Sequence, residues 1–249
     1  MTVPPRLRVI GPGRAGRSLA AALGDAGWEV VGLLGRGDDV AEALVGTDLL
    51  VVATPDRAVA PVAAAVRPAA PGAGGVVAHL AGSLGLASLA PHAAIAALHP
   101  LVSLPSPEVG AARLRSGPWF AVAGHPIAQR VVADLGGRWF EVADADRATY
   151  HAAAAVASNH LVALLGQVER LARGIGVPPE AYLALAADTL ANVAALGAAE
   201  ALTGPVARGD WDTVARHLAA LDPEEQEAYR ALAAAARRLV DGTGLPPEL

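Results

Sequence analysis

The chain has 249 residues, enough to bury a sizeable core in one large domain or two modest ones. Its formal net charge of −5, without a basic cluster, argues against a nucleic-acid partner, and the absence of cysteine excludes disulfides, thiolate metal sites and a cysteine nucleophile. Residues 68–107 carry no charged side chain, but prolines and glycines interrupt them before any apolar span reaches membrane length. The first six residues lack the apolar segment of a signal peptide, so we expect a cytoplasmic protein without a membrane span.

The first predicted element is a short apolar strand, residues 7–10, followed by the turn Gly11-Pro12-Gly13-Arg14-Ala15-Gly16 and a helix. A strand before this spacing and a helix after it are the context of a dinucleotide site. Gly11 allows the sharp turn, Gly13 leaves room for a pyrophosphate, and Gly16 lets the helix pack closely on the strand. We predict that residues 11–16 bind a dinucleotide; the alternative is a purely structural turn.

The next strand, residues 28–34, ends where dinucleotide-binding folds carry an acidic residue for the ribose hydroxyls of NAD. No acidic residue stands at that place in this chain, and Arg36 follows instead. With Arg14 in the preceding turn, a cation here suits the 2′-phosphate of NADP. The alternative makes Arg36 a solvated turn residue and Asp38 a displaced ribose ligand. Charge type and position favour NADP(H).

The rest of the first half alternates apolar strands with helices. This pattern indicates an α/β Rossmann domain with a mostly parallel sheet covered on both faces. At the carboxyl ends of the strands we expect residues 11–16, Arg36, Thr54-Pro55-Asp56, residues 79–83 and His99-Pro100. Further strands are expected at residues 48–53, 74–80, 94–98, 117–122 and 138–142, and helices at residues 38–45, 56–66 and 125–135.

From Asp144 the pattern changes to helices alone. We therefore predict a Rossmann dinucleotide-binding domain at residues 1–143 and an all-helical domain at residues 144–249. Asp144 is the expected N-cap of a long helix that continues to Arg173, and Asp210 is the expected cap of a later one. The Ala- and Leu-rich helices offer more apolar surface than one small domain covers, which predicts a homodimer through this half. The later helices are expected at residues 179–202, 210–221 and 223–240, with a break at Thr203-Gly204-Pro205.

Several stretches together carry a family resemblance: Gly11–Gly16, Ala53–Asp56, His79–Ser83, Leu98–Leu101, Tyr150–Ala154, Ser158-Asn159, Thr203–Pro205 and Arg208–Asp210. The chain resembles the oxidoreductase family that joins a Rossmann-like domain to a helical domain of unknown function 2520. That family is related in architecture to β-hydroxyacid dehydrogenases, ketopantoate reductases and pyrroline-5-carboxylate reductases. The resemblance implies NADP-dependent reduction and a C-terminal domain of the 6-phosphogluconate-dehydrogenase type, without a general substrate.

One departure from those relatives concerns the proton donor. β-Hydroxyacid dehydrogenases and ketopantoate reductases carry a catalytic lysine on the first interdomain helix and an asparagine four residues later. Asn159 fits the asparagine, but Ala155 stands at the lysine position and the chain contains no lysine. His151 shares a helix stripe with both, so we predict His151 as the acid and Asn159 as a ligand of the substrate or its oxyanion. The alternative is that both are polar residues satisfied within a packing surface.

The strand ends supply further candidates. His99 is the second candidate acid, with a satisfied core histidine as the alternative. We expect His79 to orient the loop that carries Gly82 and Ser83, and the Ser83 hydroxyl to contact substrate or nicotinamide. His125 reads as a helix-entry residue, and no spacing of histidines and carboxylates predicts a metal site. The residues assigned to the cofactor are 11–16, Arg36, Thr54, Pro55, Asp56 and His79.

The function that fits these residues best is an NADP-dependent reductase of a small ketone, keto acid (ketopantoate-like) or imine. An anionic substrate would need an arginine from outside the uncharged segment, with Arg208, Arg113 and Arg115 as candidates. Because the lysine is missing, the alternative is a catalytically silent NADP-binding sensor or regulatory module. A dehydrogenase of a phosphorylated sugar acid is a third, weaker interpretation.

Overall fold

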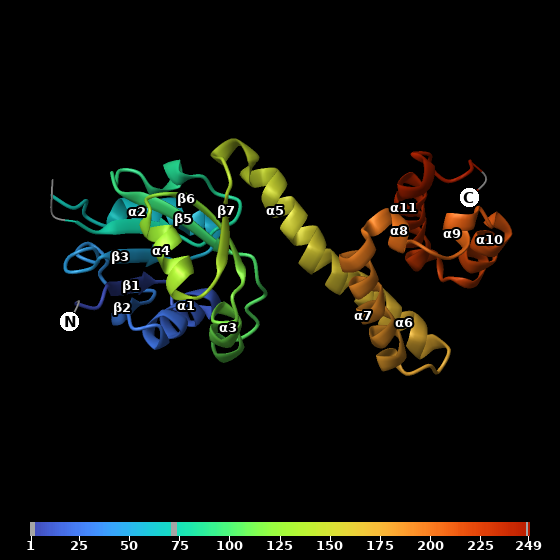
Figure 1. Ribbon diagram of the computed structural model, residues 1–249, viewed down its shortest axis with the longest axis horizontal. Coiled ribbons are helices and arrows are strands. Elements are labelled where there is room, and N and C mark those ends of the chain that lie inside the picture. Colours follow the sequence, from blue (N-terminus) through green and yellow to red (C-terminus); the bar gives the residue numbers. More distant parts are fainter. Residues whose placement is uncertain (1–2, 71–73, 248) are drawn as a thin grey trace. The chain divides into compact units, whose positions relative to one another are not determined.

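The computed structural model describes residues 3–70, 74–247 and 249, and it divides into two compact units, residues 1–159 and 160–249 (Figure 1). The sequence placed this division at residue 143. The helix between the two positions belongs to the first unit because its side chains pack there: Arg147 is buried, and the Tyr150 hydroxyl lies 2.6 Å from His99 Nδ1. Each unit is described by itself below.

The first unit is built on a seven-stranded sheet of order β2-β1-β3-β4-β5-β6-β7. Neighbouring strands run parallel, except that β5 and β6 are antiparallel. This confirms the mostly parallel sheet predicted from the apolar strands. The strands are β1 (Arg6–Ile10), β2 (Glu29–Leu34), β3 (Leu49–Val52), β4 (Val76–His79), β5 (Ile95–Pro100), β6 (Trp119–Gly124) and β7 (Arg138–Glu141).

Helices cover both faces of this sheet, so its central strands are buried throughout. Alternate side chains of β3 enter two cores: Leu49 and Val51 pack with α1, α3 and α4, and Leu50 and Val52 pack with α2. Such two-sided burial explains why β3 and β4 read as unbroken apolar runs. The helices are α1 (Arg14–Asp25), α2 (Asp56–Ala65), α3 (Pro107–Leu114) and α4 (Ile127–Asp134), with a short 3-10 turn η1 (Leu86–Leu89).

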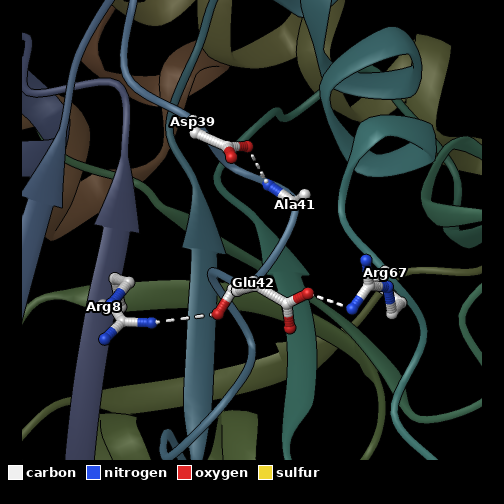
Figure 2. Close-up of polar contacts among 5 residues, drawn as sticks. All are labelled: Arg8, Asp39, Ala41, Glu42 and Arg67. Carbon is white, nitrogen blue, oxygen red and sulfur yellow. Dashed lines mark hydrogen bonds and ion pairs between the residues drawn. The ribbon is translucent and has the colours of Figure 1, made fainter.

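The helix predicted at residues 38–45 is wrong, because this segment forms turns (Figure 2). The Arg8 guanidinium on β1 donates to the carbonyl oxygens of Glu42 and Ala43, at 3.4 and 2.7 Å. In a helix those oxygens would accept from the next turn. The Asp39 carboxylate accepts from Ala41 N at 2.9 Å, and the Glu42 carboxylate pairs with Arg67 (Figure 2). Contacts with other elements therefore override the local helical pattern.

Helix α3 was not predicted, although its start carries a clear signal. Ser106 is the N-cap, its hydroxyl accepting from Val109 N at 3.3 Å, and Pro107 occupies the first turn. The helix packs closely on α1, since a methyl group added at Gly110 would lie 2.1 Å from Ser18 Oγ.

The first unit ends in a 3-10 turn η2 (Asp144–Asp146), helix α5 (Arg147–Ala155) and a π-helical turn η3 (Val156–His160). The prediction that Asp144 caps this helix is wrong. Its carboxylate instead accepts from Leu86 N at 3.0 Å and lies 3.5 Å from Arg147 Nε. Asp144 thereby fixes the start of α5 to the segment after β4.

The second unit is helical and has a small core of its own, in which Val206, Val214, Leu218 and Ala233 are buried. Glu225 links two of its helices through Arg170, whose Nε and Nη2 lie 2.5 and 3.0 Å from the carboxylate oxygens. The predicted cap at Asp210 is confirmed, since its carboxylate accepts from Thr213 N at 3.1 Å. No described helix is both long and apolar enough to cross a bilayer. The helices are α6 (Leu161–Gly174), α7 (Pro179–Leu196), α8 (Ala198–Ala201), α9 (Pro205–Arg208), α10 (Trp211–Ala220) and α11 (Pro223–Asp241).

Candidate functional site

The glycine turn between β1 and α1 has different steric demands at each glycine. Gly11 has a φ of +97°, and a methyl group there would lie 2.7 Å from the Ala53 carbonyl oxygen. A methyl group at Gly16 would lie 2.2 Å from the Gly11 carbonyl oxygen. At Gly13, by contrast, it would meet no atom within 4 Å. Gly11 and Gly16 are therefore required by the fold, whereas Gly13 faces open space at the start of α1.

The cations near this turn fall into two kinds. Arg17 is engaged, because its Nε donates to the Pro12 carbonyl oxygen at 2.7 Å. Arg14 and Arg36 are exposed, and their guanidinium groups have no hydrogen bond or ion pair within residues 3–70, 74–247 and 249. Asp38 closes the turn after β2, where its Oδ2 accepts from Gly35 N at 2.7 Å. The side chains free to meet an anion here are thus those of Arg14 and Arg36.

A series of contacts connects this turn to the segment after β4. Gly11 lies against Ala53 at the end of β3, and Asp56, three residues further, accepts a hydrogen bond from the Ser83 hydroxyl. A methyl group added at Gly82 would lie 2.6 Å from His151 Cδ2 and 2.9 Å from His99 Nε2. The predicted residues at the carboxyl ends of β1, β3, β4 and β5 therefore form one contiguous rim within the first unit.

Beside that rim the first unit contains a cavity of about 580 Å³. Its walls come from the end of β5 and the segment after it, from β7, and from α5 with the following π-helical turn. The lining residues are His99, Pro100, Leu101, Val102, Ser103, Phe140, Tyr150, His151, Ala153, Ala154, Ala155, Ala157, Ser158 and Asn159. Within the part of the chain that the structure describes, no Asp, Glu or Arg lines this cavity, which we call the histidine cavity.

Three aromatic side chains with titratable groups meet at the histidine cavity. His99 Nδ1 lies 2.6 Å from the Tyr150 hydroxyl oxygen, and the His99 and His151 rings stand edge to face with centroids 5.8 Å apart. Burial, then the neighbouring His151 and Arg147, lower the pKa of His99 to about 4, so its imidazole is neutral at pH 7. Burial raises the pKa of Tyr150 to about 12, so its phenol keeps its proton. The pair can therefore hold or pass a proton without carrying charge.

Two further polar side chains lie beneath the rim. Arg147 is 1% exposed, and its only charged partner within the described residues is Asp144, at 3.5 Å. His79 is 0% exposed, neither of its ring nitrogens has a hydrogen-bond partner there, and burial, then Arg147, lower its pKa to about 4. Within the described residues His79 thus has no exposed surface for a cofactor, while the Gly85 backbone, at the end of the loop with Gly82 and Ser83, acts in the opposite direction and raises the pKa of its ring.

The sequence did not identify Tyr150 or Arg147 as site residues. Both lie on the buried side of α5, three residues apart, and Tyr150 immediately precedes the predicted His151. The π-helical turn was also unforeseen, although such turns occur often at functional sites. It carries Ser158 and Asn159 along the wall of the histidine cavity.

Two of the three arginines considered for an anionic substrate have partners within the first unit. Arg113 donates to the Ser103 carbonyl oxygen at 2.8 Å, Arg115 pairs with Asp25, and Arg208 lies in the second unit. The predicted helix-entry role of His125 is confirmed, since its Nδ1 accepts from Ile127 N at 3.1 Å.

A larger cavity, of about 830 Å³, lies at the opposite edge of the sheet. Its lining includes Asp48 and Val76, at the amino ends of β3 and β4. Ligands of parallel sheets bind at the carboxyl ends of the strands, so this larger cavity is not the candidate site.

Residues 121–236 match the family described as domain of unknown function DUF2520, which confirms the resemblance stated from the sequence. A candidate NADP oxidoreductase from Bacteroides fragilis is 20% identical, with 94% of this chain and 98% of that chain covered and a TM-score of 0.77. A protein from Thermotoga maritima is 22% identical, with coverage of 94% and 98% and a TM-score of 0.72.

A third solved structure is the reductive aminase from Aspergillus terreus in complex with NADPH4, cyclohexanone and allyl amine. It is 18% identical, with 98% of this chain and 97% of that chain covered and a TM-score of 0.69. No curated protein sequence matches the chain. At these identities the likeness establishes the fold of the chain.

Proposed function

We propose that this chain is an NADP(H)-dependent oxidoreductase that reduces a small carbonyl compound or imine. The observation that carries the proposal is the contiguous rim, which leads from the glycine turn through Ala53, Asp56 and Ser83 to the histidine cavity. A nucleotide site and a cavity with proton-carrying side chains are the two parts that such a reaction needs. The Bacteroides fragilis and Aspergillus terreus proteins, whose descriptions name NADP and NADPH4, support the choice of nucleotide.

The residues at the start of α1 fit a pyrophosphate. Gly13 faces open space, and no side chain of the described residues caps the helix, so its first N–H groups are available to an anion. The exposed Arg14 and Arg36 would meet the 2′-phosphate that distinguishes NADP from NAD. Thr54, Pro55 and Asp56 follow β3 on the same rim and would border the nucleotide.

The reduction needs a proton where the substrate oxygen or nitrogen takes up charge. Bound NADPH supplies the hydride, which adds two electrons to the carbonyl or imine carbon. His151 is our first candidate for the proton, because its ring lines the histidine cavity against Gly82. Tyr150 is the second, since its phenol stays protonated and is still a stronger acid than the alcohol formed.

His99 takes a different role from the one predicted. With a pKa of about 4 it carries no extra proton to donate at pH 7, so we assign it to holding the Tyr150 hydroxyl at 2.6 Å. Asn159 and Ser158 on the π-helical turn would hold the substrate, and Ser83 would orient the group bound beside Asp56.

The experiment that tests this proposal makes two measurements. Titration with NADPH and NADH measures binding, and absorbance of NADPH follows its oxidation with a panel of ketones, keto acids and cyclic imines. If the protein binds NADPH and oxidises it with at least one of these classes of compound, the result supports the proposed reductase activity. Tight NADPH binding without oxidation by any class would favour the silent sensor instead.

We also propose that a second copy of the chain covers helix α7. None of its 18 residues is buried, and Leu183, Leu185, Leu190 and Leu196 are 51–60% exposed. Sedimentation at micromolar concentration should show a dimer, and the double change Leu185→Glu with Leu190→Glu should give monomers. A wild-type monomer under these conditions would contradict the proposal.

A further inference from the structure

Arg147, at the start of α5, is the bulkiest side chain that the described residues bury almost completely. It is 1% exposed, and none of its three guanidinium nitrogens has a hydrogen-bond partner within those residues. An arginine side chain keeps its proton even when it is buried. The first unit therefore contains a fixed positive charge beneath the rim, and the reduction proposed above gives that charge no task.

The position of Arg147 is set by Asp144. One oxygen of the Asp144 carboxylate lies 3.5 Å from Arg147 Nε, and the other accepts from Leu86 N at 3.0 Å. A methyl group added at Gly85 would lie 2.5 Å from the same carboxylate, so the segment after β4 packs directly against it. Asp144 thus ties the start of α5, and Arg147 with it, to the segment that follows His79.

From this position Arg147 lies near the groups that would handle the proton. Tyr150 and His151 follow it by three and four residues, a spacing that places all three on one side of α5. The Tyr150 hydroxyl lies 2.6 Å from His99 Nδ1. The charge of Arg147 also acts on the buried His79, where only burial lowers the pKa of the ring more.

The charges around the two imidazoles act in opposite directions. Burial, then His151 and Arg147, lower the pKa of His99 to about 4, against the Asp56 carboxylate, which raises it. The titratable groups that face His79 and His99 are Asp56 on α2, Asp144 in η2, and Arg147, Tyr150 and His151 on α5. Arg147 is the one among them whose charge does not change with pH between 4 and 10.

We propose that Arg147 is a positioning residue, whose fixed charge keeps His79 and His99 uncharged and thereby keeps His99 and Tyr150 as a neutral hydrogen-bonded pair. A neutral imidazole can either accept a hydrogen bond from the phenol or donate one to it, whereas an imidazolium can only donate. The inference rests on the proposed function, which gives the pair its task of passing a proton. Arg147 acts through the pair and does not touch the substrate.

Two substitutions separate charge from packing. Arg147→Met keeps an unbranched side chain and removes the charge, whereas Arg147→Lys keeps the charge. Nuclear magnetic resonance of histidine-labelled protein follows the protonation of each ring with pH, and His79→Gln and His99→Gln assign the two signals. Arg173→Met, which removes an exposed charge in the second unit, is the control.

We expect Arg147→Met to raise the pKa of both rings by about one pH unit, because a nearby positive charge opposes the imidazolium. Arg147→Lys and Arg173→Met should leave both midpoints near the wild-type value. Unchanged midpoints in Arg147→Met would overturn the inference. Equal rises in the Met and Lys variants would also overturn it, since Arg147 would then act by packing alone.

Asp144→Asn gives a test of opposite sign that leaves Arg147 in the chain, and it decides the question if Arg147→Met does not fold. The amide oxygen can still accept from Leu86 N, but the charge that offsets Arg147 is lost. The protonated fraction of His79 at pH 4 should therefore fall. A fraction that stayed the same or rose would contradict a controlling charge on Arg147.

Kinetics connect this charge to the reaction. With a compound that the wild type reduces, the acidic inflection in kcat/KM should move upward in Arg147→Met by the same amount as the His99 midpoint. An inflection that stayed in place would overturn a role of Arg147 in the reaction. If the midpoints moved but the wild type reduced no compound, the inference about Arg147 would stand and the reductase would be refuted.

Discussion

The two ends of the candidate site differ in charge and in exposure to water. At the glycine turn, Gly13 faces open space and two arginines stand free in solvent. At the histidine cavity His99, Tyr150 and His151 are half-buried, and burial lowers the pKa of His99 to about 4, so that its imidazole is neutral at pH 7. An exposed cationic end suits a phosphorylated nucleotide that must bind and leave, whereas a half-buried imidazole held against a phenol suits proton transfer. Changes at the two ends should therefore alter different measured quantities.

The largest effect is expected at the histidine cavity. Replacing the true proton donor, His151→Gln or Tyr150→Phe, should lower kcat by about 10²–10⁴, because proton transfer in the transition state is lost. The affinity for NADPH should stay unchanged, since neither side chain belongs to the nucleotide end. Steady-state kinetics and NADPH titration measure the two quantities, with Ser103→Ala as a control in the same cavity.

The pH profile then separates the two donors. An imidazolium donor predicts a kcat that falls above the pKa of the histidine, whereas a phenol whose pKa is about 12 sustains activity well into the alkaline range. Full turnover in both variants would exclude side-chain donation by either residue and leave water as the donor.

The next largest effect concerns space at the nucleotide end. Gly13 has a φ of −78° and no neighbour within 4 Å of an added methyl group, so Gly13→Val should fold normally. The side chain would occupy the room left for the pyrophosphate and should weaken NADPH binding by about 10- to 100-fold. Calorimetric titration measures the affinity for NADPH, and a thermal melt shows whether the variant folds as stably as the wild type.

A second glycine serves as the contrast. Gly11→Ala should instead lower the Tm, because its φ is +97° and the new methyl group would lie 2.7 Å from a backbone oxygen. If Gly13→Val bound NADPH as tightly as the wild type, the pyrophosphate would not lie on this turn.

A comparable or smaller effect is expected from charge at the same end. Arg36→Ala should weaken NADPH binding by about 1.5–3 kcal/mol, the contribution of a charge-assisted hydrogen bond, and leave NADH binding unchanged. Arg173→Ala, in the second unit, removes an equal charge far along the chain and serves as the control. If Arg36→Ala lost the same affinity for NADPH and for NADH, Arg36 would not contact the 2′-phosphate.

The smallest effect concerns the buried His79 beneath the rim. The pKa of His79 is lowered to about 4 in the folded chain from 6.5, so between these values the unfolded chain binds a proton that the folded chain does not. Folding stability should therefore fall as the pH drops from about 6.5 towards 4. Because the His79 ring nitrogens have no partner within the described residues, His79→Leu should lessen this acid sensitivity by a few degrees of Tm.

Thermal melts between pH 7 and pH 4 measure this difference, with His160→Gln as an exposed control. If the Tm of His79→Leu fell on acidification as much as that of the wild type, a group other than His79 would cause the loss of stability at low pH.

Local sequence patterns predicted an element correctly where its conformation depends on residues only a few positions away. The glycine turn, the buried strands β3 and β4 and the cap at Asp210 all depend on neighbours along the chain, and each lies where it was predicted. The signal for α3 was equally local, in Ser106 and Pro107, and was overlooked.

The sequence by itself determined the order of the strands, the glycine turn between β1 and α1, and the presence of His151, His99 and Asn159 near one rim. The tertiary structure alone decided how they meet. The Tyr150 hydroxyl contacts His99, 51 residues away in the sequence, and the Asp144 carboxylate accepts from Leu86 N, 58 residues away. Arg8 donates to carbonyl oxygens that would accept intrahelical hydrogen bonds in a helix at residues 38–45. Periodicity reports which face of an element is apolar, but it holds no information about which distant polar group will compete for a given hydrogen bond. Those long-range contacts brought α5 into the first unit and placed the Tyr150 hydroxyl against His99.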